Sequence, residues 1–198
     1  MAGKWSLMVR YPWVCLLLGM LAIARVQAFD DPRHQEAAGV AGQAAVRVLF
    51  SPGHDIAGAM VDALRHARRQ VLVQSFSFTH GGIAQALLAA QRRGVEVKVI
   101  ADREQTENME HGQVPGLARA GVPVWLDGDH QSAHSKVMVI DAGMPSAVVI
   151  TGSFNFTRAA QHKNAENTVF ISGNDALAEA YVQNWQRHRA HSTPLVIH

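Results

Sequence analysis

Two short segments of the sequence carry side chains that suit chemistry at a phosphate group. The first contains His134 and Lys136, followed by residues 137–140, which are apolar on both faces and indicate a buried strand. Alternate residues of a strand face the same side, so the imidazole and the ammonium are expected to project together. Such a pair alone is more typical of a structural contact than of a catalytic site. The second segment therefore decides between these two interpretations.

The second segment, residues 151–157, offers hydrogen-bonding groups next to a glycine. Gly152 permits a close approach of the backbone, and Ser153 and Asn155, again two residues apart, provide a hydroxyl and an amide. Basic and hydrogen-bonding groups directed at one point suit a phosphodiester better than a carbonyl, because the phosphodiester is charged before and throughout its reaction. Together the segments indicate phosphoryl-transfer chemistry.

These segments resemble the HKD motif of the phospholipase D superfamily. The matching residues are His134-x-Lys136-x4-Asp141, then Gly152-Ser153-Phe154-Asn155. Ten residues separate Asp141 from Gly152 where six are usual in many members, and the extra residues around Gly143 are expected to lengthen a hairpin. The resemblance covers residues 45–190 and is strongest to small bacterial periplasmic endonucleases of that superfamily.

The resemblance implies a covalent two-step reaction. In the superfamily one histidine attacks phosphorus to give a phosphohistidine, and a second histidine protonates the leaving oxygen. This chain has one motif only, so the resemblance implies a homodimer in which His134 of each subunit faces the same phosphate. Two histidines and two lysines then supply the positive charge that Mg²⁺ provides in metal-dependent nucleases, so neither a metal nor another cofactor is expected.

The resemblance also implies roles for the other motif residues. Lys136 would pair with the non-bridging phosphate oxygens, and Ser153 and Asn155 would add hydrogen bonds. Glu166 matches the carboxylate that accepts a hydrogen bond from the imidazole and fixes its tautomer. Asp141 belongs to the motif, but five residues beyond Lys136 it points to the opposite face of an ideal strand, so a structural role is expected.

The sequence allows two interpretations for each of four nearby residues. Lys163 and Arg158 flank the second segment and either bind neighbouring phosphates of the substrate or are simply solvated. Phe76 and Phe78 either stack on bases or, as alternating strand residues, belong to the core.

The histidines outside the motif are not expected to bind metal. His130 precedes His134 by four residues, which is the spacing of a metal-binding pair on a helix, but these two residues fall on a loop and a strand. His188 and His191, near the end of the chain, are expected to lie on the surface.

Alternating strands and helices must position these residues. The predicted strands are 45–50, 71–78, 95–101, 122–126, 133–140, 147–151 and 167–171, and the predicted helices are 55–69, 83–93, 117–120 and 175–189. Residues 103–113 are polar and show no clear element. This order predicts a single-domain α/β fold with a mixed β-sheet flanked by helices on both faces. The resemblance implies that this fold is phospholipase D-like. The similar segments 75–79 and 153–157 reflect either coincidence or internal pseudo-symmetry.

The first 28 residues have the pattern of a secretory signal peptide. Lys4 and Arg10 precede an apolar run, residues 13–24, that is short for a membrane span, and residues 26–28 resemble a cleavage site. Cleavage after Ala28 would leave a flexible leader (29–43), a catalytic domain (44–191) and a tail (192–198). The mature protein would then be periplasmic or secreted, without stable membrane association. Retention of the segment as an anchor is the alternative.

Composition and charge exclude several classes of protein. The chain has 198 residues, of which 48% are hydrophobic and 17% charged, and this excludes collagen-like, wholly disordered and multi-pass membrane proteins. A single cysteine excludes a disulfide framework and a Cys-based zinc finger. Removal of residues 1–28 would leave 15 basic and 16 acidic side chains. Binding of nucleic acid would therefore depend on a local cluster of cations.

The expected activity is that of a metal-independent phosphodiesterase, an endonuclease of DNA or RNA with little sequence preference. A phosphatidyl hydrolase or transferase is the first alternative, although lipid-acting relatives commonly carry two motifs in one longer chain. A non-catalytic nucleic-acid-binding module is the second alternative, although such a module needs no nucleophile.

Overall fold

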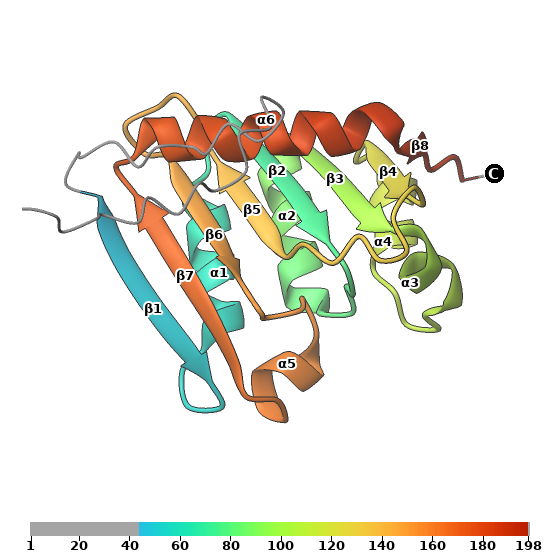
Figure 1. The fold of residues 1–198 in the computed structure, drawn as a ribbon, viewed down its shortest axis with the longest axis horizontal. Helices are drawn as coiled ribbons and strands as arrows, with labels where there is room; N and C mark the ends of the chain where they lie inside the picture. The colour runs from blue at the N-terminus through green and yellow to red at the C-terminus, as the bar shows by residue number, and fades with distance from the viewer. Residues whose placement is uncertain (1–43, 198) are drawn as a thin grey trace, which may run out of the picture. The chain divides into compact units, whose positions relative to one another are not determined.

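All strands that the structure describes belong to one mixed sheet (Figure 1). The computed structural model describes residues 44–197, so the predicted signal peptide and leader lie outside the described residues. The strands are β1 (Ala45–Ser51), β2 (Gln70–Ser75), β3 (Glu96–Asp102), β4 (Val124–Asp127), β5 (Val137–Ile140), β6 (Val148–Gly152), β7 (Glu166–Ser172) and β8 (Thr193–Pro194). The helices are α1 (Ile56–His66), α2 (Gly81–Arg92), α3 (Arg103–Asn108), α4 (Val114–Arg119), α5 (Arg158–His162) and α6 (Asp175–His191).

Parallel and antiparallel pairs are combined in the sheet order β1-β7-β6-β5-β2-β3-β4-β8. The neighbours β2, β3 and β4 run parallel, as strands joined through helices do. The pairs β2–β5, β5–β6, β6–β7, β7–β1 and β4–β8 are antiparallel. The predicted mixed sheet is thereby confirmed.

Helices cover both faces of this sheet, which confirms the predicted architecture. α1 and α2 pack on one face around Ile56 and Leu87, and α6 packs across the other face through Trp185 (Figure 1). Successive side chains of β2 pack against opposite helix layers, because Leu72 lies on the Trp185 side of the sheet and Val73 on the opposite side. The indole Nε1 of Trp185 also donates a hydrogen bond to the Val73 carbonyl oxygen at 3.0 Å, which ties α6 to β2.

Two short helices, α3 and α5, were not predicted from the sequence. Neither shows the apolar periodicity on which helix prediction depends, and α3 has no buried residue. Each begins instead at a capping side chain, since Asp102 accepts a hydrogen bond from the Gln105 amide and Thr157 accepts one from the Ala160 amide. None of the helices in residues 44–197 has the length and apolar composition of a membrane span.

Several predicted boundaries differ from the structure, and two of these differences change how a segment is assigned. The strand predicted for residues 133–140 begins only at Val137, because β2 pairs with β5 no further than Gln74 opposite Val137. Residues 133–136 therefore form a loop that leads into β5. At the C-terminus, part of the predicted tail 192–198 forms β8, which pairs with β4 and extends the sheet beyond residue 191.

Candidate active site

The predicted site residues other than Asp141 meet at one edge of the sheet, the lower edge in Figure 1. β2 ends at this edge, and because β5 is antiparallel to β2, the loop carrying His134 and Lys136 lies there too. β6 ends and β7 begins at the same edge, which brings in Ser153 and Glu166. The two motif segments, distant in sequence, are therefore neighbours in the folded chain.

His134 and Lys136 are held together by contacts within their loop and with Phe76. The Nζ atom of Lys136 donates a hydrogen bond to the carbonyl oxygen of His134 at 2.6 Å. The Phe76 ring centroid lies 4.5 Å from the imidazole centroid and 4.8 Å from Lys136 Nζ. The His134 residue is exposed, whereas Lys136 is 6% exposed. An accessible imidazole thus stands beside a largely buried cation.

Phe76 and Phe78 have different environments despite their similar sequence positions. Phe78 lies in the core, where its ring meets that of Phe156 edge-on at 5.4 Å. A backbone bridge joins Phe78 to Phe156, so the similar segments 75–79 and 153–157 lie side by side at the site edge. Phe76, by contrast, is part of the candidate site.

The environment of Lys136 favours loss of its proton. Burial lowers the pKa of Lys136 from its ordinary value of 10.5 to about 8, and the nearby carboxylates of Glu166 and Asp102 oppose this shift. An anion bound beside Nζ would raise the pKa of Lys136 again and so favour its charged form. Lys136 is therefore a cation that a phosphate group could stabilise on binding.

Ser153 and Glu166 form a small hydrogen-bond network next to this cation. Ser153 Oγ donates to Glu166 Oε2 at 2.6 Å and accepts a hydrogen bond from the Asn167 amide at 3.1 Å. The second oxygen of Glu166 accepts from Asn164 Nδ2 at 2.9 Å. Within residues 44–197 these are the partners of the Glu166 carboxylate, and the predicted contact with His134 is not among them.

Gly152 is required by the close approach of β6 and β7. A Cβ atom at this position would overlap the carbonyl oxygen of Asn167. Two residues later, the Oδ1 atom of Asn155 is buried and has no hydrogen-bond partner in the described part of the chain. The described residues therefore provide no hydrogen bond that fixes the orientation of the Asn155 amide through this oxygen.

Asp141 lies at the opposite end of β5 from His134. Its carboxylate accepts hydrogen bonds from the backbone amides of Arg68, Arg69 and Gln70, at 2.7–3.1 Å. The first two amides belong to the connection between α1 and β2, and the third belongs to the first residue of β2, so Asp141 joins the start of β2 to the end of β5. The structure therefore places Asp141 away from the other motif residues.

Arg158 and Lys163 lie on and just beyond α5, on the chain between Ser153 and Glu166. Both side chains are exposed, and neither forms an ion pair within residues 44–197. The structure therefore leaves both available to a polyanion that extends past the site.

Sequence reasoning missed Asp102, the last residue of β3. This buried carboxylate caps α3 and also accepts a hydrogen bond from the Ala133 amide at 2.8 Å, next to His134. It thus fixes the loop that carries the motif histidine. Its position directly after a buried strand was the available signal, because strand ends commonly carry site residues.

Known proteins share both the sequence and the fold of this chain. A family model described as "Cardiolipin synthase, PLD-like domain" matches residues 60–189. A phospholipase D of Rickettsia bellii is 36% identical over 145 residues, which cover 73% of this chain and 69% of the relative. Nuc, a phospholipase D family member from Salmonella typhimurium, has a crystal structure that matches with a TM-score of 0.71 and 31% identity, covering 78% of this chain and 100% of Nuc. A mitochondrial cardiolipin hydrolase of Xenopus tropicalis is 34% identical over 124 residues, or 63% of this chain and 56% of the relative.

Proposed function

The chain belongs to the phospholipase D superfamily, and we propose that it is an endonuclease that cleaves nucleic acid through His134 in a homodimer. The observation that carries this proposal is the exposed imidazole of His134 next to the largely buried ammonium of Lys136. A nucleophile and a phosphate-binding cation are thereby presented at one accessible edge of the sheet.

In the proposed reaction a ring nitrogen of His134 attacks phosphorus, and the bond from phosphorus to the leaving oxygen breaks. The partner subunit's His134 donates its proton to that oxygen. Water then attacks the phosphohistidine, gives up a proton to the partner's His134, and releases the phosphate end. Lys136 balances the charge of the non-bridging oxygens throughout, so the chemical step needs no metal ion.

The surface of β1 supports the proposed dimer. Val46, Val48 and Phe50 are exposed apolar residues, and Phe50 pairs across the sheet with Asn167 beside the site. An exposed apolar stripe that ends at a functional site is typical of an interface. β7 and β6 lie between β1 and the His134 loop before β5, so the second copy would have to extend from β1 across the site ends of these two strands to place its own His134 beside the first.

Exposed cations favour nucleic acid over lipid as substrate. Arg158 and Lys163 stand near the site and suit the successive phosphates of a polynucleotide. Lipid is the second candidate, because relatives named phospholipase D and mitochondrial cardiolipin hydrolase match most of this chain. We further propose that the protein is periplasmic or secreted, on the basis of its first 28 residues.

The test is to incubate the purified protein with plasmid DNA, RNA and vesicles of phosphatidylcholine and cardiolipin, each in the presence of EDTA. We expect nicking of DNA or cleavage of RNA that is unaffected by a short exposure to EDTA, and a dimeric mass in the same sample. Turnover of lipid while nucleic acid stays intact would overturn the proposed substrate but support the proposed reaction at His134. Absence of both reactions in a folded dimer would favour a binding module.

The pKa of Lys136 predicts how activity depends on pH. Lys136 is charged below about pH 8 and neutral above it, so phosphodiester binding weakens as the pH rises. We expect kcat/KM to fall between pH 7 and pH 9.5, while kcat falls less because bound phosphate keeps the lysine charged. In Lys136→Arg the side chain stays protonated, so kcat/KM should fall less between pH 7 and pH 9.5 than it does in the wild-type protein. A wild-type kcat/KM that is flat to pH 9.5 would contradict the assignment.

A further inference from the structure

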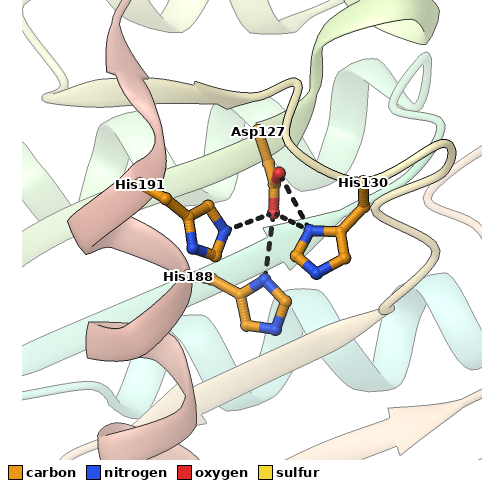
Figure 2. A group of neighbouring side chains, drawn as sticks. All are labelled: Asp127, His130, His188 and His191. Carbon is orange, nitrogen blue, oxygen red and sulfur yellow. Dashed lines mark hydrogen bonds and ion pairs between the residues drawn. The ribbon is translucent and has the colours of Figure 1, made fainter.

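Three histidines surround a buried carboxylate at the end of β4 (Figure 2). The carboxylate is that of Asp127, whose side chain is 0% exposed. His130 lies on the loop that follows β4, whereas His188 and His191 lie on the last turns of α6. All three imidazoles point toward Asp127 in Figure 2, and none of them belongs to the HKD motif.

The nitrogen atoms that face Asp127 are close to its oxygens. His188 Nδ1 lies 2.9 Å and His191 Nε2 3.2 Å from Oδ2, and His130 Nδ1 lies 3.2 Å from Oδ1. The four potential ligand atoms all lie within 4.8 Å of one another. Three nitrogens and one oxygen thus lie close enough together for a single ion to bind all four.

The buried carboxylate has no lysine or arginine partner within residues 44–197. Its contacts are the three imidazoles and the Asp129 amide at 3.2 Å. A buried carboxylate without such a partner needs a compensating positive charge. Imidazoles supply that charge only when protonated, whereas a metal ion supplies it while they are neutral.

We propose that Asp127, His130, His188 and His191 bind one Zn²⁺ ion. Imidazole nitrogens and a carboxylate oxygen are ligands that zinc prefers, and four protein ligands match its tetrahedral coordination. Bonds of about 2.0–2.1 Å place tetrahedral ligand atoms roughly 3.3 Å apart, so the imidazoles need to move inward by about an ångström. His130 on a loop and His191 at the end of α6 are placed to make this adjustment.

The bound zinc would position the loop that carries the nucleophile. Residues 128–136 start beside the zinc ligands and end at Lys136, and His130 and His134 line the same cavity of about 220 Å³. The hydrogen bond from Ala133 to Asp102 holds the far part of the loop, and zinc would fasten the near part to α6. Four protein ligands leave no open coordination position, so zinc acts here on structure and not in the chemical step.

The expectation that these histidines bind no metal rests on the spacing between His130 and His134 alone. The fold instead brings His130 to α6, where His188 and His191 are three residues apart and lie on one face of the helix. The pairs Asp127-x2-His130 and His188-x2-His191 were the signal in the sequence.

The direct test measures zinc binding by the purified protein. We would strip metal by prolonged dialysis against dipicolinate, add Zn²⁺ alone, remove the excess, and determine bound metal and Tm. One zinc per chain and a rise in Tm of roughly 5–10 °C are expected. Hydrogen exchange should slow in residues 128–136 when zinc is present. No bound zinc and an unchanged Tm would overturn the proposal and leave a purely hydrogen-bonded histidine cluster.

Single substitutions assign the ligands. His188→Ala and His191→Ala should each lose the bound zinc and the rise in Tm, whereas His66→Ala, a matched control on an exposed helix surface, should keep both. Co²⁺ in place of zinc should give the visible absorption of a tetrahedral site, and His191→Ala should abolish it. Equal zinc binding by His66→Ala and His191→Ala would overturn the assignment. Because metal content is read without a nuclease assay, this result is independent of the proposed function.

Discussion

His134→Ala should reduce cleavage of nucleic acid by at least about 10⁴-fold, because removal of a covalent nucleophile leaves only binding and electrostatic contributions. The residue is exposed, so the free energy of unfolding should change by less than about 1 kcal/mol. The measurement is single-turnover cleavage of plasmid DNA together with thermal unfolding of the same preparation. Wild-type protein quenched during turnover should carry a phosphoramidate bond on His134 that is stable to alkali and labile to acid.

His66→Ala is the matched control for this variant. His66 lies on α1 with its side chain 77% exposed, near Asp62 one turn earlier, so its loss should leave the rate within about twofold. Activity of His134→Ala above a tenth of the wild-type rate, at equal stability, would contradict the nucleophile assignment.

Mixed dimers test whether both subunits contribute to one site. If each phosphate needs two copies of His134, only dimers of two wild-type subunits are active, and an exchanged equimolar mixture retains about a quarter of the activity. A site that is complete within one subunit would instead retain about half. This comparison separates the dimer proposal from the identity of the nucleophile.

Periodicity predicted the order of the main elements because their apolar residues pack against each other across the sheet. In β2, every residue from Val71 to Ser75 is buried, and such a run shows in the sequence as a continuous strand pattern. α3 and α5 lack this signal, since they depend on a capping side chain. The first part of the strand predicted for residues 133–140 is wrong because a strand needs a paired neighbour, and β2 pairs with β5 only as far as Val137.

The candidate site was predictable only to the extent that it lies within local motifs. The pairing of His134 with Lys136 holds in the fold, although through a loop hydrogen bond and not through strand alternation. The contacts of Asp127 with His188 and His191 join positions that are 61 and 64 residues apart. No local pattern encodes such contacts, because they arise from the passage of α6 across the sheet.

Asp141→Ala should lower the free energy of unfolding by about 3 kcal/mol, which corresponds to a fall in Tm of roughly 6–12 °C. The Asp141 residue is 1% exposed, and its carboxylate is the acceptor for the amides of residues 68–70. Alanine would leave these donors without a protein partner. The residue also has a φ of 53°, a backbone conformation that aspartate tolerates better than alanine. Chemical denaturation of the variant beside wild-type protein measures the loss.

Two variants and an activity assay separate this structural role from a catalytic one. Asp141→Asn keeps one acceptor oxygen and a side chain that tolerates positive φ, so it should lose about half as much stability. Ser146→Ala removes only a 3.4 Å contact with the carboxylate and should be neutral. Asp141 lies beyond the far end of β5, roughly 13 Å along the strand from the site, so the folded fraction of Asp141→Ala should cleave substrate within a few-fold of the wild-type rate. Full stability combined with lost cleavage would place this aspartate in the chemistry after all.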